Sequence, residues 1–123
     1  MASLADRVLD QGLNILDTEA NKITITSQES TTYASANSTH ALGASTSLSI
    51  GSPDNRSGGG REVTVQAITD GSVSSSGTAT HYAILDTNNS RLLATGSLAS
   101  SQSVTSGNSF TLATFTIGIP DPA

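Results

Sequence analysis

The chain has 123 residues and no cysteine, so its length suits one ordinary domain, and disulfides and thiolate metal sites are excluded. Ten acidic residues against five basic ones give a formal net charge of −5, and the basic residues are scattered, which argues against a nucleic-acid-binding surface. Serine (21 residues) and threonine (17 residues) are abundant, and this bias favours strands joined by short turns.

The stretch from residue 3 to residue 16 has the apolar spacing of a helix. Five apolar side chains recur there at intervals of three or four positions: Leu4, Val8, Leu9, Leu13 and Leu16. The pattern predicts an amphipathic helix, which Gly12 can end early. Its apolar stripe either covers a sheet of the same chain or lies in an interface with a neighbouring subunit, and the two roles are compatible. No signal peptide and no membrane-spanning segment is expected.

After Asn21 the apolar residues alternate, which predicts strands. In the stretch 23–26, isoleucines take one face and threonines the other, as in a half-buried strand. Residues 30–45 are polar and predict irregular structure, and a strand signal returns at Leu48 and Ile50.

A loop is expected over residues 51–60, because Pro53 removes a backbone donor and three consecutive glycines end the segment. Asp54, Asn55 and Arg56 lie at its centre and are candidates for contact with a partner.

Two more strands are predicted beyond this loop, with Asp70-Gly71 as a turn between them. Residues 81–86 and 91–95 then predict a hairpin around the stretch 87–90 (TNNS), because asparagine tolerates the positive φ of a short turn.

The last predicted strand runs from Phe110 to Ile119. Its apolar residues change parity near Ala113-Thr114, which predicts a β-bulge within one strand. With seven or eight strands and one N-terminal helix, the chain is predicted to be an all-β antiparallel sandwich or jelly-roll-like barrel. We expect a single domain over residues 1–123, with a helix or arm at 1–20 and a β-domain at 21–123.

Catalytic chemistry has little support in the sequence. His40 and His81 are the only histidines, and neither belongs to a metal-binding or nucleophile motif. The glycine loop lacks the Lys-Ser/Thr pair of a phosphate cradle. We therefore predict a protein without enzymatic activity, cofactor or metal.

Two weaker ligand hypotheses remain open. Carboxylate and amide oxygens at residues 86–89 and 54–55 could bind calcium, although turn chemistry explains both runs. Tyr33 and Tyr82 offer a thin basis for a carbohydrate site in a chain without tryptophan.

Several segments resemble small virion proteins of tailed bacteriophages and prophages. These segments are residues 5–13 (ADRVLDQGL), 16–23 (LDTEANKI), 27–34 (SQESTTYA), 83–87 (AILDT) and 90–94 (SRLLA). Such proteins often have proline at the position of Ser30 and cysteine at the position of Thr26, and both departures are tolerable structurally.

The resemblance implies a non-enzymatic head decoration, or cement, protein that binds the major capsid protein and stabilises the shell. We expect a homo-oligomer, a trimer among the options, made in the host bacterial cytoplasm and located on the capsid exterior, with neither nucleic acid nor membrane as a partner. The predicted assembly surface comprises Leu4, Val8, Leu9, Leu13, Asp54, Asn55 and Arg56. The alternatives are a tail, neck or fibre subunit, and a carbohydrate-binding or adhesin β-sandwich module.

Overall fold

The computed structural model describes residues 5–120, which form two compact units, each built from separate stretches of the chain. Unit 1 contains the chain up to Glu19, Ser49–Ala67 and the chain from Ala113. Unit 2 contains Ala20–Leu48 and Ile68–Leu112. The predicted all-β class is confirmed: two antiparallel sheets and one short N-terminal helix fit a fold of the sandwich or barrel type.

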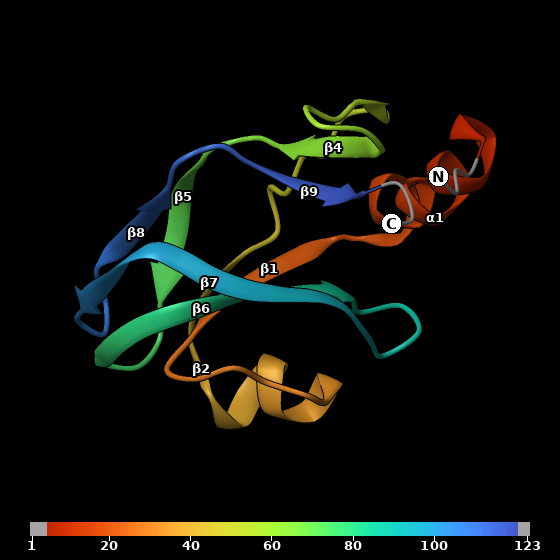
Figure 1. Cartoon of the computed structure of the whole chain (residues 1–123). Helices are drawn as coiled ribbons and strands as arrows, with labels where there is room; N and C mark the ends of the chain where they lie inside the picture. The colour runs from red at the N-terminus through yellow and green to blue at the C-terminus, as the bar shows by residue number, and fades with distance from the viewer. Residues whose placement is uncertain (1–4, 121–123) are drawn as a thin grey trace. The chain divides into compact units, whose positions relative to one another are not determined.

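Unit 2 is a six-stranded antiparallel sheet with the strand order β7-β6-β1-β2-β5-β8 (Figure 1). Its strands are β1 (Lys22–Thr26), β2 (Ala41–Ser45), β5 (Ile68–Val73), β6 (Gly77–Asp86), β7 (Arg91–Val104) and β8 (Ser109–Leu112). The sheet curls until its two edge strands meet at one corner, where Gln102 Nε2 on β7 donates to the Thr111 carbonyl oxygen on β8 at 3.2 Å.

The central strand β1 is buried on both faces. Ile23 and Ile25 point to one face and are fully buried, as the alternation predicts. Thr24 on the other face is equally buried, because the π-helical turn η1 (Ser35–Thr39) lies over it and the Ala36 carbonyl oxygen accepts from Thr24 Oγ1 at 2.9 Å. The prediction of a half-buried strand is therefore wrong.

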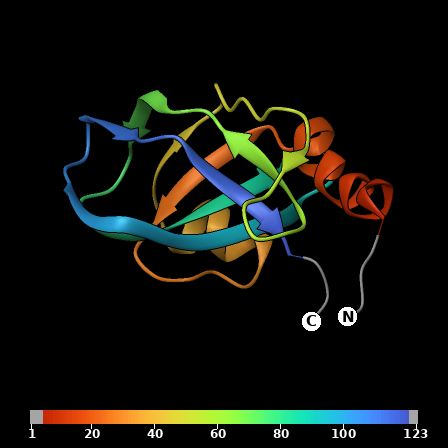
Figure 2. The same cartoon turned by 45° about the horizontal axis from the view of Figure 1, so that its top comes forward.

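Unit 1 contains the helix α1 (Asp6–Glu19) and a three-stranded antiparallel sheet of order β3-β4-β9, in which β9 lies alongside β4 (Figure 2). The strands are β3 (Asp54–Asn55), β4 (Arg61–Val65) and β9 (Phe115–Ile119). Val63 and Val65 are fully buried on the face that also bears Arg61, because alternate residues of a strand share a face. The helix packs on this face, and Gly12 is so close to β9 that a Cβ there would lie 3.5 Å from Ile119 Cδ1.

Two sequence-based expectations for the later strands are corrected. The parity change near Ala113-Thr114 is not a bulge, because β8 belongs to the six-stranded sheet and β9 to the three-stranded sheet. Asp70-Gly71 is not a turn but lies inside β5, where the pairing with β8 shifts register between Ile68 and Gly71.

The hairpin prediction is confirmed: β6 and β7 flank the turn at residues 87–90. Its residue with positive φ is Ser90 (53°) and not an asparagine. The described residues form nine strands rather than seven or eight, and Ile50 contributes only an isolated bridge to Val65. Among residues 5–120, no helix combines the length and the apolar character that crossing a membrane would take.

Candidate interaction surface

The helical part of the predicted assembly surface divides into a buried row and an exposed row. Leu9 and Leu13 are 3% and 2% exposed and pack into unit 1, whereas Val8 is 56% exposed. Ile15, which the predicted stripe did not include, is 45% exposed. Leu4 lies outside the described residues. Val8 and Ile15 are two turns apart and share one side of α1, so they form the exposed apolar row of this helix.

Asp54 and Asn55 are exposed on β3, and this short strand corrects the expectation of a loop throughout residues 51–60. β3 pairs with β4, with Asp54 opposite Glu62 and Asn55 opposite Arg61. The helix and the β3–β4 hairpin, which the sequence could only name separately, therefore belong to the same compact unit.

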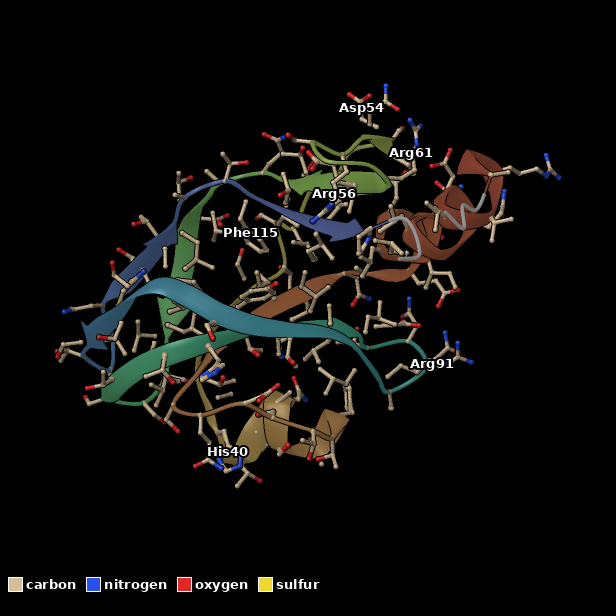
Figure 3. All side chains as sticks on the ribbon, in the orientation of Figure 1. His40, Asp54, Arg56, Arg61, Arg91 and Phe115 are labelled. Carbon is tan, nitrogen blue, oxygen red and sulfur yellow. The ribbon has the colours of Figure 1, made fainter. Side chains whose placement is uncertain are left out.

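Arg61 connects these two parts (Figure 3). Its Nε donates to Asp10 Oδ1 on α1 at 2.8 Å, and its Nη1 donates to Asn55 Oδ1 on β3 at 2.6 Å. Its Nη2 also donates to the Pro53 carbonyl oxygen at 3.3 Å and to Asp10 Oδ2 at 3.4 Å. A guanidinium suits this role because its donors form a rigid planar fork. Arg61 thus fixes the position of the helix relative to the hairpin.

The turn between β3 and β4 is held by Arg56. Its Nη1 donates to the Gly59 carbonyl oxygen at 3.0 Å, and its backbone N–H donates to the Gly60 carbonyl oxygen at 3.1 Å. Gly58, Gly59 and Gly60 have φ values of 89°, 104° and 97°, a region that favours glycine. The glycine run therefore serves a specific turn, and Arg56 is half-buried against it.

The outer face of this small sheet carries two neighbouring carboxylates. Asp54, Glu62 and Gly118 lie side by side on β3, β4 and β9. Arg56 crosses the end of the row, since a Cβ on Gly118 would come within 2.9 Å of Arg56 Cδ. Two carboxylates directly opposite each other on neighbouring strands repel, and a basic group from a partner would relieve that repulsion.

The acidic residue of the β6–β7 turn has a structural role. The Asp86 carboxylate accepts from Asn89 Nδ2 at 2.8 Å and from the Asn88 backbone N–H at 3.1 Å. These hydrogen bonds, with that from Asn89 the largest effect, lower the pKa of Asp86. No group of three or more His, Asp or Glu side chains among residues 5–120 could hold a metal ion.

Sequence reasoning missed Asp10, Ile15 and Arg61 as parts of this surface. Ile15 could have been found, because it lies seven positions after Val8 and continues the same side of the helix. The bond between Asp10 and Arg61 joins residues 51 positions apart, and no local pattern indicates it.

Comparisons with models of known protein families, with curated proteins and with solved structures found no match to this chain.

Proposed function

We propose that this protein is a non-enzymatic bacteriophage capsid decoration protein. It would bind the major capsid protein through the surface formed by α1 and the β3–β4 hairpin, and it would act as a homo-oligomer on the outside of the shell. The observations that carry the proposal are the exposed apolar row of Val8 and Ile15 on α1 and, in the same unit, the hairpin that presents Asp54 and Asn55.

The surface has features that suit binding to many equivalent sites. Val8 and Ile15 offer apolar area that unit 1 does not use for its own core, and burying such area favours association. Arg61 and Arg56 hold the hairpin in place, and a rigid surface loses less conformational entropy on binding. The carboxylates of Asp54 and Glu62 favour a partner with basic side chains.

The test mixes the purified protein with capsids that lack it and counts bound copies per capsomer by cryo-electron microscopy. We expect symmetric, stoichiometric occupancy for the unchanged protein. Val8→Ser combined with Ile15→Ser should reduce the affinity at least tenfold, because apolar contact area is lost. Asp17→Ser on the same helix is the matched control, since Asp17 is exposed but lies outside the apolar row.

Three results would contradict the proposal in different ways. Empty capsids with the unchanged protein would overturn decoration and favour a tail, neck or fibre subunit. Full occupancy by the Val8→Ser/Ile15→Ser variant would show that the helix does not make the contact. Binding to a glycan array would favour the carbohydrate-binding module.

A further inference from the structure

Two hydroxyl groups in unit 2 are buried without a protein partner. Thr26 is 0% exposed and Ser30 is 3% exposed, and no group of residues 5–120 bonds Thr26 Oγ1 or Ser30 Oγ. By contrast, Thr24 on the same face of β1 donates its hydroxyl to the Ala36 carbonyl oxygen. A buried hydroxyl without a hydrogen bond destabilises the folded state, so Thr26 and Ser30 require an explanation.

Thr26 lies on the face of the six-stranded sheet that η1 covers, and Ser30 belongs to the connection that leads from β1 to η1. Thr26 ends β1 on the face that η1 covers, because Thr24 and Thr26 point the same way. Ser30 lies in the connection from β1 to η1, between Ser27, whose N–H donates to the His40 carbonyl oxygen at 3.0 Å, and Tyr33, which packs with the cluster under η1. That connection therefore returns across the face on which Thr26 lies.

His81 contributes an acceptor on this face. It is directly opposite Thr26 on the neighbouring strand β6, and side chains of such pairs begin about 4.5–5.5 Å apart. Thr80 Oγ1 has a single proton, which it donates to the Ser27 carbonyl oxygen at 3.1 Å. The 2.8 Å contact between Thr80 Oγ1 and His81 Nδ1 is then a bond that Nδ1–H donates. The neutral form of His81 is consequently the Nδ1–H tautomer, with a lone pair on Nε2.

We propose that this end of unit 2 binds one internal water molecule between Thr26, Ser30 and His81. The two hydroxyl groups each donate a hydrogen bond to the water oxygen, and the water molecule donates one hydrogen bond to His81 Nε2. All three protein groups are then satisfied by a ligand that makes three hydrogen bonds, the usual number for buried water. The site does not depend on the proposed function, since it concerns the folding of unit 2.

The first test measures whether Thr26→Val raises or lowers Tm. This substitution keeps the shape of the side chain and removes the hydroxyl. Loss of a bridging hydroxyl should lower Tm by several degrees, as should Ser30→Ala. A higher Tm in both variants would overturn the proposal, because it would mean that both hydroxyls were buried unpaired. The matched control is Thr24→Val, which should lower Tm by removing the bond to Ala36.

The second test is NMR on the unchanged protein. We expect cross-peaks between a long-lived water and the Thr26 side chain, and ring ¹⁵N shifts that assign His81 to the Nδ1–H tautomer. The Nε2 shift should change in Thr26→Val and stay the same in Thr24→Val. Absence of the water cross-peaks, or an Nε2–H tautomer, would overturn the proposal whatever the effect on Tm.

Discussion

Arg61 shows how one side chain can hold a surface together. It bonds Asp10 on the helix, Asn55 on β3 and the carbonyl oxygen of Pro53, and its own side chain is 15% exposed. An exposed ion pair contributes little to stability, but a largely buried guanidinium with several partners contributes more, because its loss leaves those partners unsatisfied.

We therefore expect Arg61→Lys to destabilise the protein by about 1–2 kcal/mol, although the charge is kept, because an ammonium cannot reproduce the planar fork. Urea unfolding monitored by circular dichroism measures the change. Arg7→Lys is the control, since Arg7 is exposed on α1. Equal unfolding midpoints for the two variants would contradict this role of Arg61.

Two aspartates link stability to pH. Hydrogen bonds from Ser47 Oγ, the larger effect, and from Ser45 Oγ lower the pKa of Asp70, and the hydrogen bond from Asn89 Nδ2 is the main reason that the pKa of Asp86 is lowered. A carboxyl whose pKa is lower in the folded state stabilises that state fully above its unfolded-state pKa, which is about 3.9 for aspartate. This contribution disappears as the pH falls from there through the folded-state pKa.

The protein should thus lose stability below about pH 4, and the combined variant Asp70→Asn/Asp86→Asn should lose less over that range, because two of the titrating groups are gone. Urea midpoints between about pH 2 and pH 6 give the two profiles. Parallel profiles for the two proteins would show that these carboxyls do not cause the acid sensitivity.

At the scale of elements, the packing of β8 against β5 leaves no room for a side chain at Gly71. A Cβ on Gly71 would lie 2.4 Å from Phe110 Cε1, so the ring occupies the space in which a side chain would be. We expect Gly71→Ala to destabilise the protein by about 1–3 kcal/mol through this overlap.

The control is Gly51→Ala, where the nearest atom to the new Cβ would be 3.9 Å away. Combining Gly71→Ala with Phe110→Leu should cost less than the sum of the two changes, because the smaller side chain relieves the overlap. Additive costs in thermal unfolding would mean that the Phe110 ring is not the obstacle.

The sequence predicted those elements whose signal is local. The helix, the strands at 23–26 and 63–65 and the β6–β7 hairpin follow from apolar spacing and turn residues, and all are present. The strand signal at Leu48 and Ile50 was wrong, since Ile50 makes only an isolated bridge, and β2 lies in a stretch that was expected to be irregular. The sequence did not predict η1, because residues 35–39 (SANST) have no apolar periodicity, and the hydrogen bond that joins η1 to Thr24 on β1 has no local signal. The chain crossing between β8 and β9 was also missed, since a parity change has the same sequence signature whether it marks a bulge or a change of sheet.

The candidate surface was predictable only in part, for a related reason. Periodicity identified an apolar helix face, but it could not separate Leu9 and Leu13, which unit 1 buries, from Val8, which it leaves exposed. That division depends on where β4 and β9 lie, and their pairing joins residues far apart in the sequence.

At the scale of the whole molecule, the two units are interleaved along the chain, which passes between them after Glu19, Leu48, Ala67 and Leu112. If unit 2 is folded and unit 1 is not, the two segments of unit 2 are joined by one free loop, Ser49–Ala67. If unit 1 is folded and unit 2 is not, two free loops of roughly 29 and 45 residues must close.

The length-dependent part of the cost of closing a flexible loop is about (3/2)RT ln n, which is roughly 2.6 kcal/mol for the single loop and roughly 6 kcal/mol for the two loops together. Unit 1 should therefore depend on unit 2 for its stability more than unit 2 depends on unit 1. The consequence is a partial unfolding in which α1 and the three-stranded sheet open while the six-stranded sheet stays closed.

Hydrogen exchange on two core variants measures this asymmetry. Leu13→Ala in unit 1 removes a side chain that is 2% exposed and should cost about 2–5 kcal/mol. We expect it to lower protection in β4 and β9 and to leave β1 and β6 nearly unchanged, whereas Ile84→Ala in unit 2 should lower protection in all four strands. Equal loss of protection everywhere in Leu13→Ala would mean that the chain unfolds as a single cooperative domain, because its opening would then expose both sheets at once.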